Sequence, residues 1–129
     1  MKRLILKKLP PFIWAFLIYL GSSLPSAQVS QNSFLDFLAH KAVHLFEYAV
    51  LYLLFYRSFT ENFWQVRSKV IFVSVVFVTF YGTFDEYHQT FILGRNGRYQ
   101  DVFVDFFGGL LGLVLWLFLR QRKQQKLKN

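Results

Sequence analysis

Long apolar stretches with almost no charge in their middles constrain this chain more than any other feature. They lie at about residues 9–24, 37–59, 70–91 and 102–119. A helix needs about 20 residues to cross the hydrocarbon of a bilayer, and each stretch approaches or reaches that length. The pattern predicts an all-α membrane protein, a bundle of about four transmembrane helices that forms one domain over residues 1–129.

The composition agrees with lipid as the solvent. Hydrophobic residues make up 54% of the chain and aromatic residues 21%, including 17 Phe, whereas charged residues supply only 17%. A soluble domain of this length would need a more polar surface. The chain contains no cysteine, which excludes disulfides, thiolate metal sites and cysteine nucleophiles, so any metal site must use His, Asp and Glu.

The formal net charge of +8 invites a comparison with nucleic-acid-binding proteins. The basic residues sit at helix ends, however, and form no stripe interleaved with exposed aromatic residues. We therefore predict no nucleic-acid partner and attribute the basicity to membrane topology.

With four spans, the charges separate by membrane face. One face holds twelve of the 15 basic residues, namely Lys2, Arg3, Lys7, Lys8, Arg57, Arg67, Lys69, Arg120, Arg122, Lys123, Lys126 and Lys128, and a single acid, Glu61. The other face holds Lys41, Arg95, Arg98 and the acids Asp36, Glu47, Asp85, Glu86, Asp101 and Asp105. Because Lys and Arg accumulate in cytoplasmic loops, both termini are predicted to be cytoplasmic.

The first apolar stretch has a second interpretation. A basic start, a short apolar run and the small residues Gly21 to Ser23 also fit a cleaved signal peptide, although Pro25 and the bulky aromatic residues favour a retained helix. Both interpretations place residue 30 outside.

Ionisable residues inside the other stretches are costly in hydrocarbon and mark a functional site. In the second stretch, His40, His44 and Glu47 follow at i, i+4 and i+7, so they share one helical face. Tyr48 lies beside them, and Lys41 is at the periphery. In the third stretch Asp85 shares a helix side with His88 and with Gln89, whereas Glu86 points elsewhere.

The fourth stretch contributes Asp101 and Asp105, one turn apart, and its small residues Gly108 and Gly112 allow another backbone to approach closely. The loop before it, Gly94-Arg95-Asn96-Gly97-Arg98, is basic and contains two glycines. These guanidiniums can pair with the nearby acids or clamp a phosphate of a lipid headgroup.

In this order and spacing, the residues resemble the pattern of the VanZ-like family of small bacterial membrane proteins, named after a protein associated with resistance to the glycopeptide teicoplanin. The matching positions are Lys41, His44, Tyr48, Asp85, Glu86, Gln89, Gly94, Arg95, Asp101, Asp105 and Gly108. His40 replaces the usual Asp, and Asp105 stands where Asn is usual. The resemblance implies a multi-pass protein of the bacterial cytoplasmic membrane with a role in the cell envelope at the outer face and in antibiotic susceptibility.

Three functions fit these residues. The first is binding of an anionic lipid or lipid-linked wall precursor, for which the ligand-binding candidates are Lys41, Tyr48, Gln89, Arg95 and Arg98. The second is a metal-dependent membrane enzyme acting on a phospholipid or polyprenyl-phosphate headgroup. Its catalytic candidates are His44, Glu47, Asp85, Glu86, Asp101 and Asp105. The candidate ligands of a divalent metal are His44, Glu47, Asp85 and His88, and Asp101 or Asp105 could complete the site. Proton or ion translocation is the third, but the inner halves of the second and fourth helices carry no ionisable path.

Overall fold

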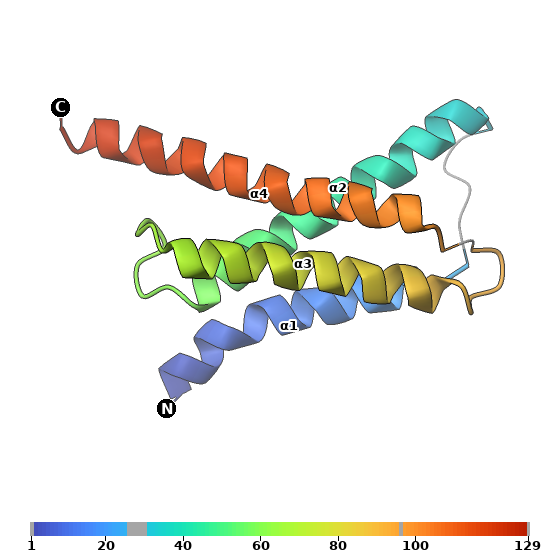
Figure 1. The fold of residues 1–129 in the computed structure, drawn as a ribbon, viewed down its shortest axis with the longest axis horizontal. Coiled ribbons are helices and arrows are strands. Elements are labelled where there is room, and N and C mark those ends of the chain that lie inside the picture. Colours follow the sequence, from blue (N-terminus) through green and yellow to red (C-terminus); the bar gives the residue numbers. More distant parts are fainter. Residues whose placement is uncertain (1, 26–30, 96, 129) are drawn as a thin grey trace.

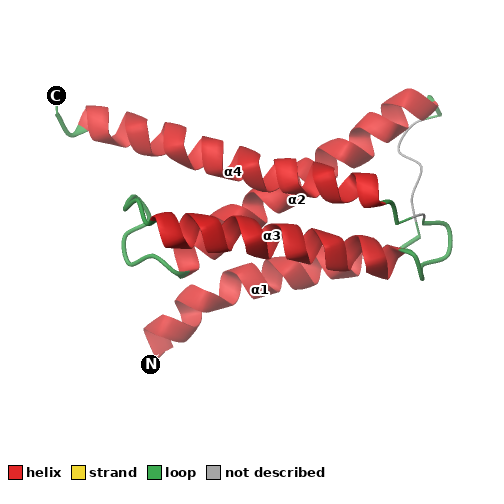
Figure 2. Ribbon diagram, viewed as in Figure 1, coloured by secondary structure: helices red, strands yellow, loops and turns green. Residues whose placement is uncertain are grey.

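The computed structural model describes residues 2–25, 31–95 and 97–128, with side chains from residue 6 onward. Its elements in order are α1 (Lys2–Ser22), α2 (Ser33–Ser58), α3 (Ser68–Gln89) and α4 (Tyr99–Lys126), as Figure 1 shows. No strand occurs in this described part of the chain (Figure 2). The prediction of an all-α protein with four helices is confirmed.

All four helices begin before the predicted apolar stretches, α1 by the most residues, but only α4 ends after its stretch. α4 continues past the last apolar residue to Lys126, because the tail consists largely of Arg, Gln and Lys, which are good helix formers. α2 begins earlier than predicted, at Ser33, where the Asn32 side chain accepts hydrogen bonds from the backbone N–H groups of Phe34 and Leu35 at 3.0 and 3.3 Å. An N-cap of this kind supplies acceptors for the unpaired amides of the first turn.

Three of the helices, α2, α3 and α4, are long and apolar enough to cross a membrane. α1 differs because its first eight residues include four Lys and Arg, which shorten its apolar stretch. The protein is therefore a multi-pass membrane protein by the length and composition of its helices.

The interior of the protein contains many polar side chains, whereas much of its surface is apolar. Buried positions hold Tyr48, Tyr52, Tyr56, Ser74 and Asp105. The exposed large side chains include Phe16, Phe46, Phe72, Phe80, Phe103 and Phe107. Such an arrangement would be unfavourable in water and is favourable in lipid, where polar groups are satisfied inside the bundle.

Close packing of α2 against α4 depends on two glycines. A Cβ on Gly108 would lie 2.8 Å from the backbone oxygen of Leu45, and a Cβ on Gly112 would lie 2.6 Å from that of Ala49. The absence of side chains at these positions brings the two backbones together, as the sequence pattern predicted.

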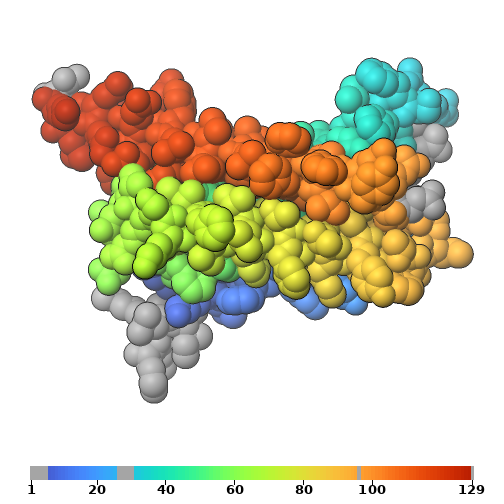
Figure 3. Space-filling view, in the orientation of Figure 1, coloured from blue at the N-terminus to red at the C-terminus, as the bar shows by residue number. Residues whose placement is uncertain are grey.

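The connections lie at two ends of the protein. Both termini and the α2–α3 loop lie at one end, whereas the α3–α4 loop and the facing ends of α1 and α2 lie at the other (Figure 1). The second of these is called the polar end below. The N-terminal part of α2 and the C-terminal part of α4 project from the body of the protein at opposite ends (Figure 3).

Candidate functional site at the polar end

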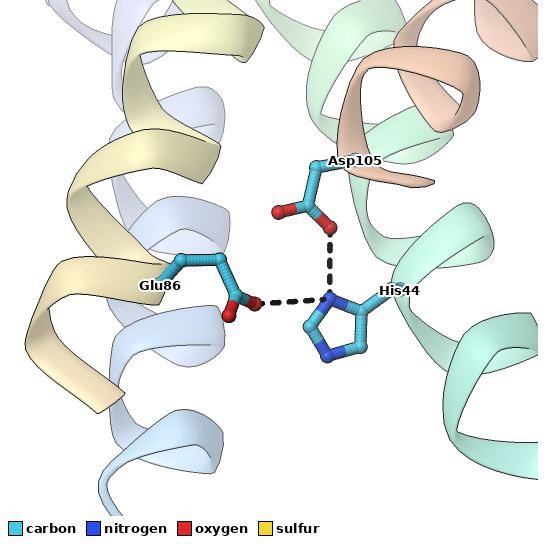
Figure 4. Close-up of side chains that lie close together, drawn as sticks. All are labelled: His44, Glu86 and Asp105. Carbon is cyan, nitrogen blue, oxygen red and sulfur yellow. Dashed lines mark hydrogen bonds and ion pairs between the residues drawn. The ribbon is translucent and has the colours of Figure 1, made fainter. Parts of the chain in front are cut away.

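Three helices bring an imidazole and two carboxylates together at the polar end. His44 on α2 places its Nδ1 atom 2.8 Å from Oδ1 of Asp105 on α4 and 3.9 Å from Oε1 of Glu86 on α3 (Figure 4). Asp105 is 0% exposed and Glu86 is 4% exposed. We call these residues the three-helix cluster.

Gly82 makes room for the Asp105 carboxylate. A Cβ at this position would lie 2.8 Å from both Cβ and Oδ2 of Asp105, so any larger residue would push α3 away from α4. The Oδ2 atom is buried and accepts no hydrogen bond from the described residues. Gly82 was not among the predicted site residues. It lies one turn before Glu86 on the same side of α3, and that spacing could have indicated that it belongs to the site.

A second group of polar side chains surrounds Asp85. The Ser22 hydroxyl on α1 donates to Asp85 Oδ1 at 2.6 Å, and Gln89 Nε2 donates to Asp85 Oδ2 at 2.9 Å. Gln89 Nε2 also lies 3.4 Å from Oε1 of Glu86, so it connects the two neighbouring acids. Sequence reasoning missed this role of Ser22, because nothing in the sequence indicates which helix faces Asp85.

Arg95 binds α1 rather than an acid. Its guanidinium donates to the backbone oxygens of Leu24 at 2.7 Å and Gly21 at 2.9 Å, and to Oε1 of Gln89 at 3.4 Å. The last carbonyls of a helix lack partners within the helix, so they are good acceptors for a cation. Within the described ranges no carboxylate lies within salt-bridge distance of Arg95. The sequence had suggested an ion pair between Arg95 and a nearby acid, and the described residues do not form it.

Lys41 and Arg98, the other basic residues of the polar end, make different contacts. Lys41 forms an ion pair with Asp101. Arg98 donates its backbone N–H to Oε2 of Glu86 at 2.9 Å, while its side chain is exposed and bonds no other residue in the part of the chain that the structure describes.

Three other predicted residues lie around the cluster. Glu47 lines the same cavity as Asp85, and its backbone oxygen accepts a hydrogen bond from Trp14 on α1 at 2.9 Å. Tyr48 is fully buried and its ring is stacked beside His44. His88 packs against Tyr19 on α1 with ring centroids 4.5 Å apart, so it lies outside the three-helix cluster. Of the four predicted metal ligands, His44, Glu47 and Asp85 share one cavity.

Two adjoining cavities reach these residues. The first, of about 320 Å³, lies between the end of α1 and α2 and is lined by Leu24, Pro25, Ala39 and Val43 as well as by Glu47, Asp85 and the residues shared with its neighbour. The second, of about 270 Å³, is lined by Lys41, Arg98 and Asp101 among others. The shared residues are His40, His44, Gln89 and Arg95. The cavities thus combine apolar walls, acidic groups and an unpaired cation.

Comparison with known proteins identifies the family. The VanZ/LLP1 family model matches residues 5–120. The chain belongs to the VanZ/LLP1 family. The match covers all the candidate site residues of this VanZ-like membrane protein and confirms the resemblance drawn from its motifs. Neither the curated proteins nor the solved structures gave a match.

Proposed function

We propose that this VanZ-like protein binds the anionic headgroup of a lipid or lipid-linked wall precursor at its polar end, as part of a role in the cell envelope. The observation that carries this proposal is the exposed Arg98 guanidinium, which has no partner among the described residues and lines a cavity that continues into an apolar-walled one. A guanidinium offers a forked set of donors that matches phosphate oxygens.

The cavity walls suit an amphiphilic ligand. Leu24, Ala39 and Val43 supply apolar surface toward lipid, where an acyl or polyprenyl chain can lie. Lys41 and Arg95 line the second cavity and add positive potential, although both already bind groups within the protein. A phosphate between Arg98 and these two cations would have favourable electrostatics.

The proposal places the polar end at the outer face of the bacterial cytoplasmic membrane, with both termini in the cytoplasm and α1 as a fourth span. It rests on the charge distribution, because the opposite end carries most of the Lys and Arg residues. We also propose that α1 is retained, since Ser22 and the carbonyls of Gly21 and Leu24 complete the hydrogen bonds of Asp85 and Arg95.

Cysteine labelling tests the orientation, and the chain is suited to it because it has no cysteine of its own. Ser33 begins α2 at the polar end and Ser68 begins α3 at the other end, and both are exposed. In intact cells, a membrane-impermeant maleimide is expected to label Ser33→Cys and to label Ser68→Cys only after permeabilisation. Labelling of Ser68→Cys alone in intact cells would reverse the orientation, and equal labelling would contradict the separation of the ends.

Headgroup binding is tested by the variant Arg98→Ala. Purified protein is supplied with phosphatidylglycerol or with a polyprenyl phosphate, and the retained ligand is measured by mass spectrometry. We expect Arg98→Ala to weaken retention by about 3-fold to 10-fold, since a charged hydrogen bond at an exposed position is lost.

Arg122→Ala is the matched control, because Arg122 is an exposed arginine on α4 beyond the predicted apolar stretch, at the other end of the protein. It should leave retention unchanged. Equal retention by wild type and Arg98→Ala for both ligands would refute the proposal, whereas a loss for one ligand alone would identify its class.

A further inference from the structure

The buried carboxylates of the polar end outnumber the cations available to them. Glu86 and Asp105 both face His44, and no other ionisable base lies within salt-bridge distance of either in the described structure. Lys41 is paired with Asp101, and Arg95 is bound to the carbonyls of α1. Buried acids are costly unless they are paired, protonated or bound to a metal.

The three-helix cluster has the arrangement of a small metal site. One ligand atom each from His44, Glu86 and Asp105 can be chosen so that all lie within 4.8 Å of one another. Metal–ligand bonds of about 2.0–2.2 Å require ligand atoms about 3–4 Å apart, so small side-chain shifts would suffice. Figure 4 shows the three groups converging, with the second Asp105 oxygen directed toward α3.

Two observations independent of this spacing also favour a ligand. Asp105 is completely buried, yet its Oδ2 atom accepts no hydrogen bond from the described residues. The Glu86 carboxylate is oriented by its other contacts. The backbone N–H of Arg98 donates to Oε2 at 2.9 Å, while Oε1 lies 3.4 Å from Gln89 Nε2 and faces His44. Outer contacts that orient a carboxylate in this way are typical of metal ligands.

We propose that His44, Glu86 and Asp105 bind a divalent transition-metal cation such as Zn²⁺ or Mn²⁺. One imidazole nitrogen with two carboxylates suits these ions, whereas Ca²⁺ and Mg²⁺ prefer oxygen ligands alone. Three protein ligands leave a position open, and the two cavities that His44 lines provide a path from the surface. This ligand set keeps His44 and Asp105 from the sequence prediction, but Glu86 takes the place of Glu47, Asp85 and His88.

The inference goes beyond headgroup binding and does not depend on it. A cation at this point would neutralise the carboxylates and join α2, α3 and α4 through their side chains. It would also supply the Lewis acid that the metal-dependent enzyme hypothesis requires, close to the cavities that Arg98 and Glu47 line.

The test uses the full chain purified without a histidine tag, stripped with chelator and then loaded with Zn²⁺ or Mn²⁺. Metal retained after gel filtration is measured by mass spectrometry, and affinity by calorimetry. We expect about one equivalent in the wild type and an affinity at least about 10-fold weaker in Glu86→Gln and in Asp105→Asn. Both substitutions keep the side-chain shape, and Glu86→Gln also keeps an oxygen for the Arg98 amide.

Asp101→Asn is the matched control, because it removes an acid from the same end of α4 but outside the cluster. It should bind metal as the wild type does. Absence of metal in the loaded wild type, or equal affinity in folded Glu86→Gln, would overturn the proposal, as would an equal loss in Asp101→Asn. If Asp105→Asn does not fold, Glu86→Gln carries the test. Arg98→Ala should retain metal while losing lipid, which separates this inference from the proposed function.

Discussion

Replacing Gly112 with valine is expected to lower the stability of the protein by about 3 kcal/mol, because overpacking at a close helix contact forces the backbones apart. A Cβ at this position already meets the oxygen of Ala49 at 2.6 Å and its Cα at 3.1 Å, and neither backbone atom can move without shifting α2. The midpoint of thermal unfolding in detergent, followed by tryptophan fluorescence, should fall by roughly 10 °C.

Gly21→Ala provides the control for this experiment. A Cβ on Gly21 has no described neighbour within 4 Å, and alanine keeps the backbone oxygen that Arg95 binds. It should leave the midpoint unchanged or raise it slightly, since alanine favours a helix more than glycine does. A Gly112→Val protein as stable as the wild type would show that α2 and α4 do not pack as closely as the structure places them.

Replacing Arg95 with alanine is expected to cause the second largest loss of stability. The variant loses three hydrogen bonds from one guanidinium, two of them to the carbonyl groups of Gly21 and Leu24 at the end of α1. Because the side chain is only half-buried, we expect a loss of about 1–2 kcal/mol, which thermal unfolding of the purified protein measures.

The loop itself offers the matched variant. Arg98→Ala removes the same charge three residues away, from a side chain without a partner in the described part, and should unfold like the wild type. Arg95→Lys should restore little, because an ammonium group cannot reach several acceptors as a planar fork does. Equal midpoints for the two alanine variants would show that Arg95 does not hold α1 in place.

The helices and their polar end were predictable from local information. Apolar stretches that approach or reach the length of a membrane span indicated the helices, and the separation of Lys and Arg from Asp and Glu indicated which connections lie at the same end. The structure differs mainly at helix ends, as at Ser33 and Lys126, where capping and helix propensity extend a helix beyond its apolar part. Those effects are small compared with the free energy of burying a span, so they shift only the boundaries.

The partners within the site were less predictable. The spacing placed Asp85 with His88 on one side of a helix and turned Glu86 to another side. In the structure Asp85 contacts Ser22, His88 packs on Tyr19, and Glu86 reaches His44. The helical period gives the angle between two side chains on one helix. It does not tell which neighbouring helix each side chain faces.

The sequence by itself determined that the protein is an all-helical membrane protein with six of its seven acids, its three histidines and three basic residues gathered at one end. It did so because charges are costly in hydrocarbon, so their positions along the chain mark where the apolar spans begin and end. Only the tertiary structure decided that His44 meets Glu86 and Asp105, and that Arg95 binds α1. Those contacts depend on the rotation and separation of packed helices, which glycines such as Gly82 and Gly112 set by close contact with neighbouring helices.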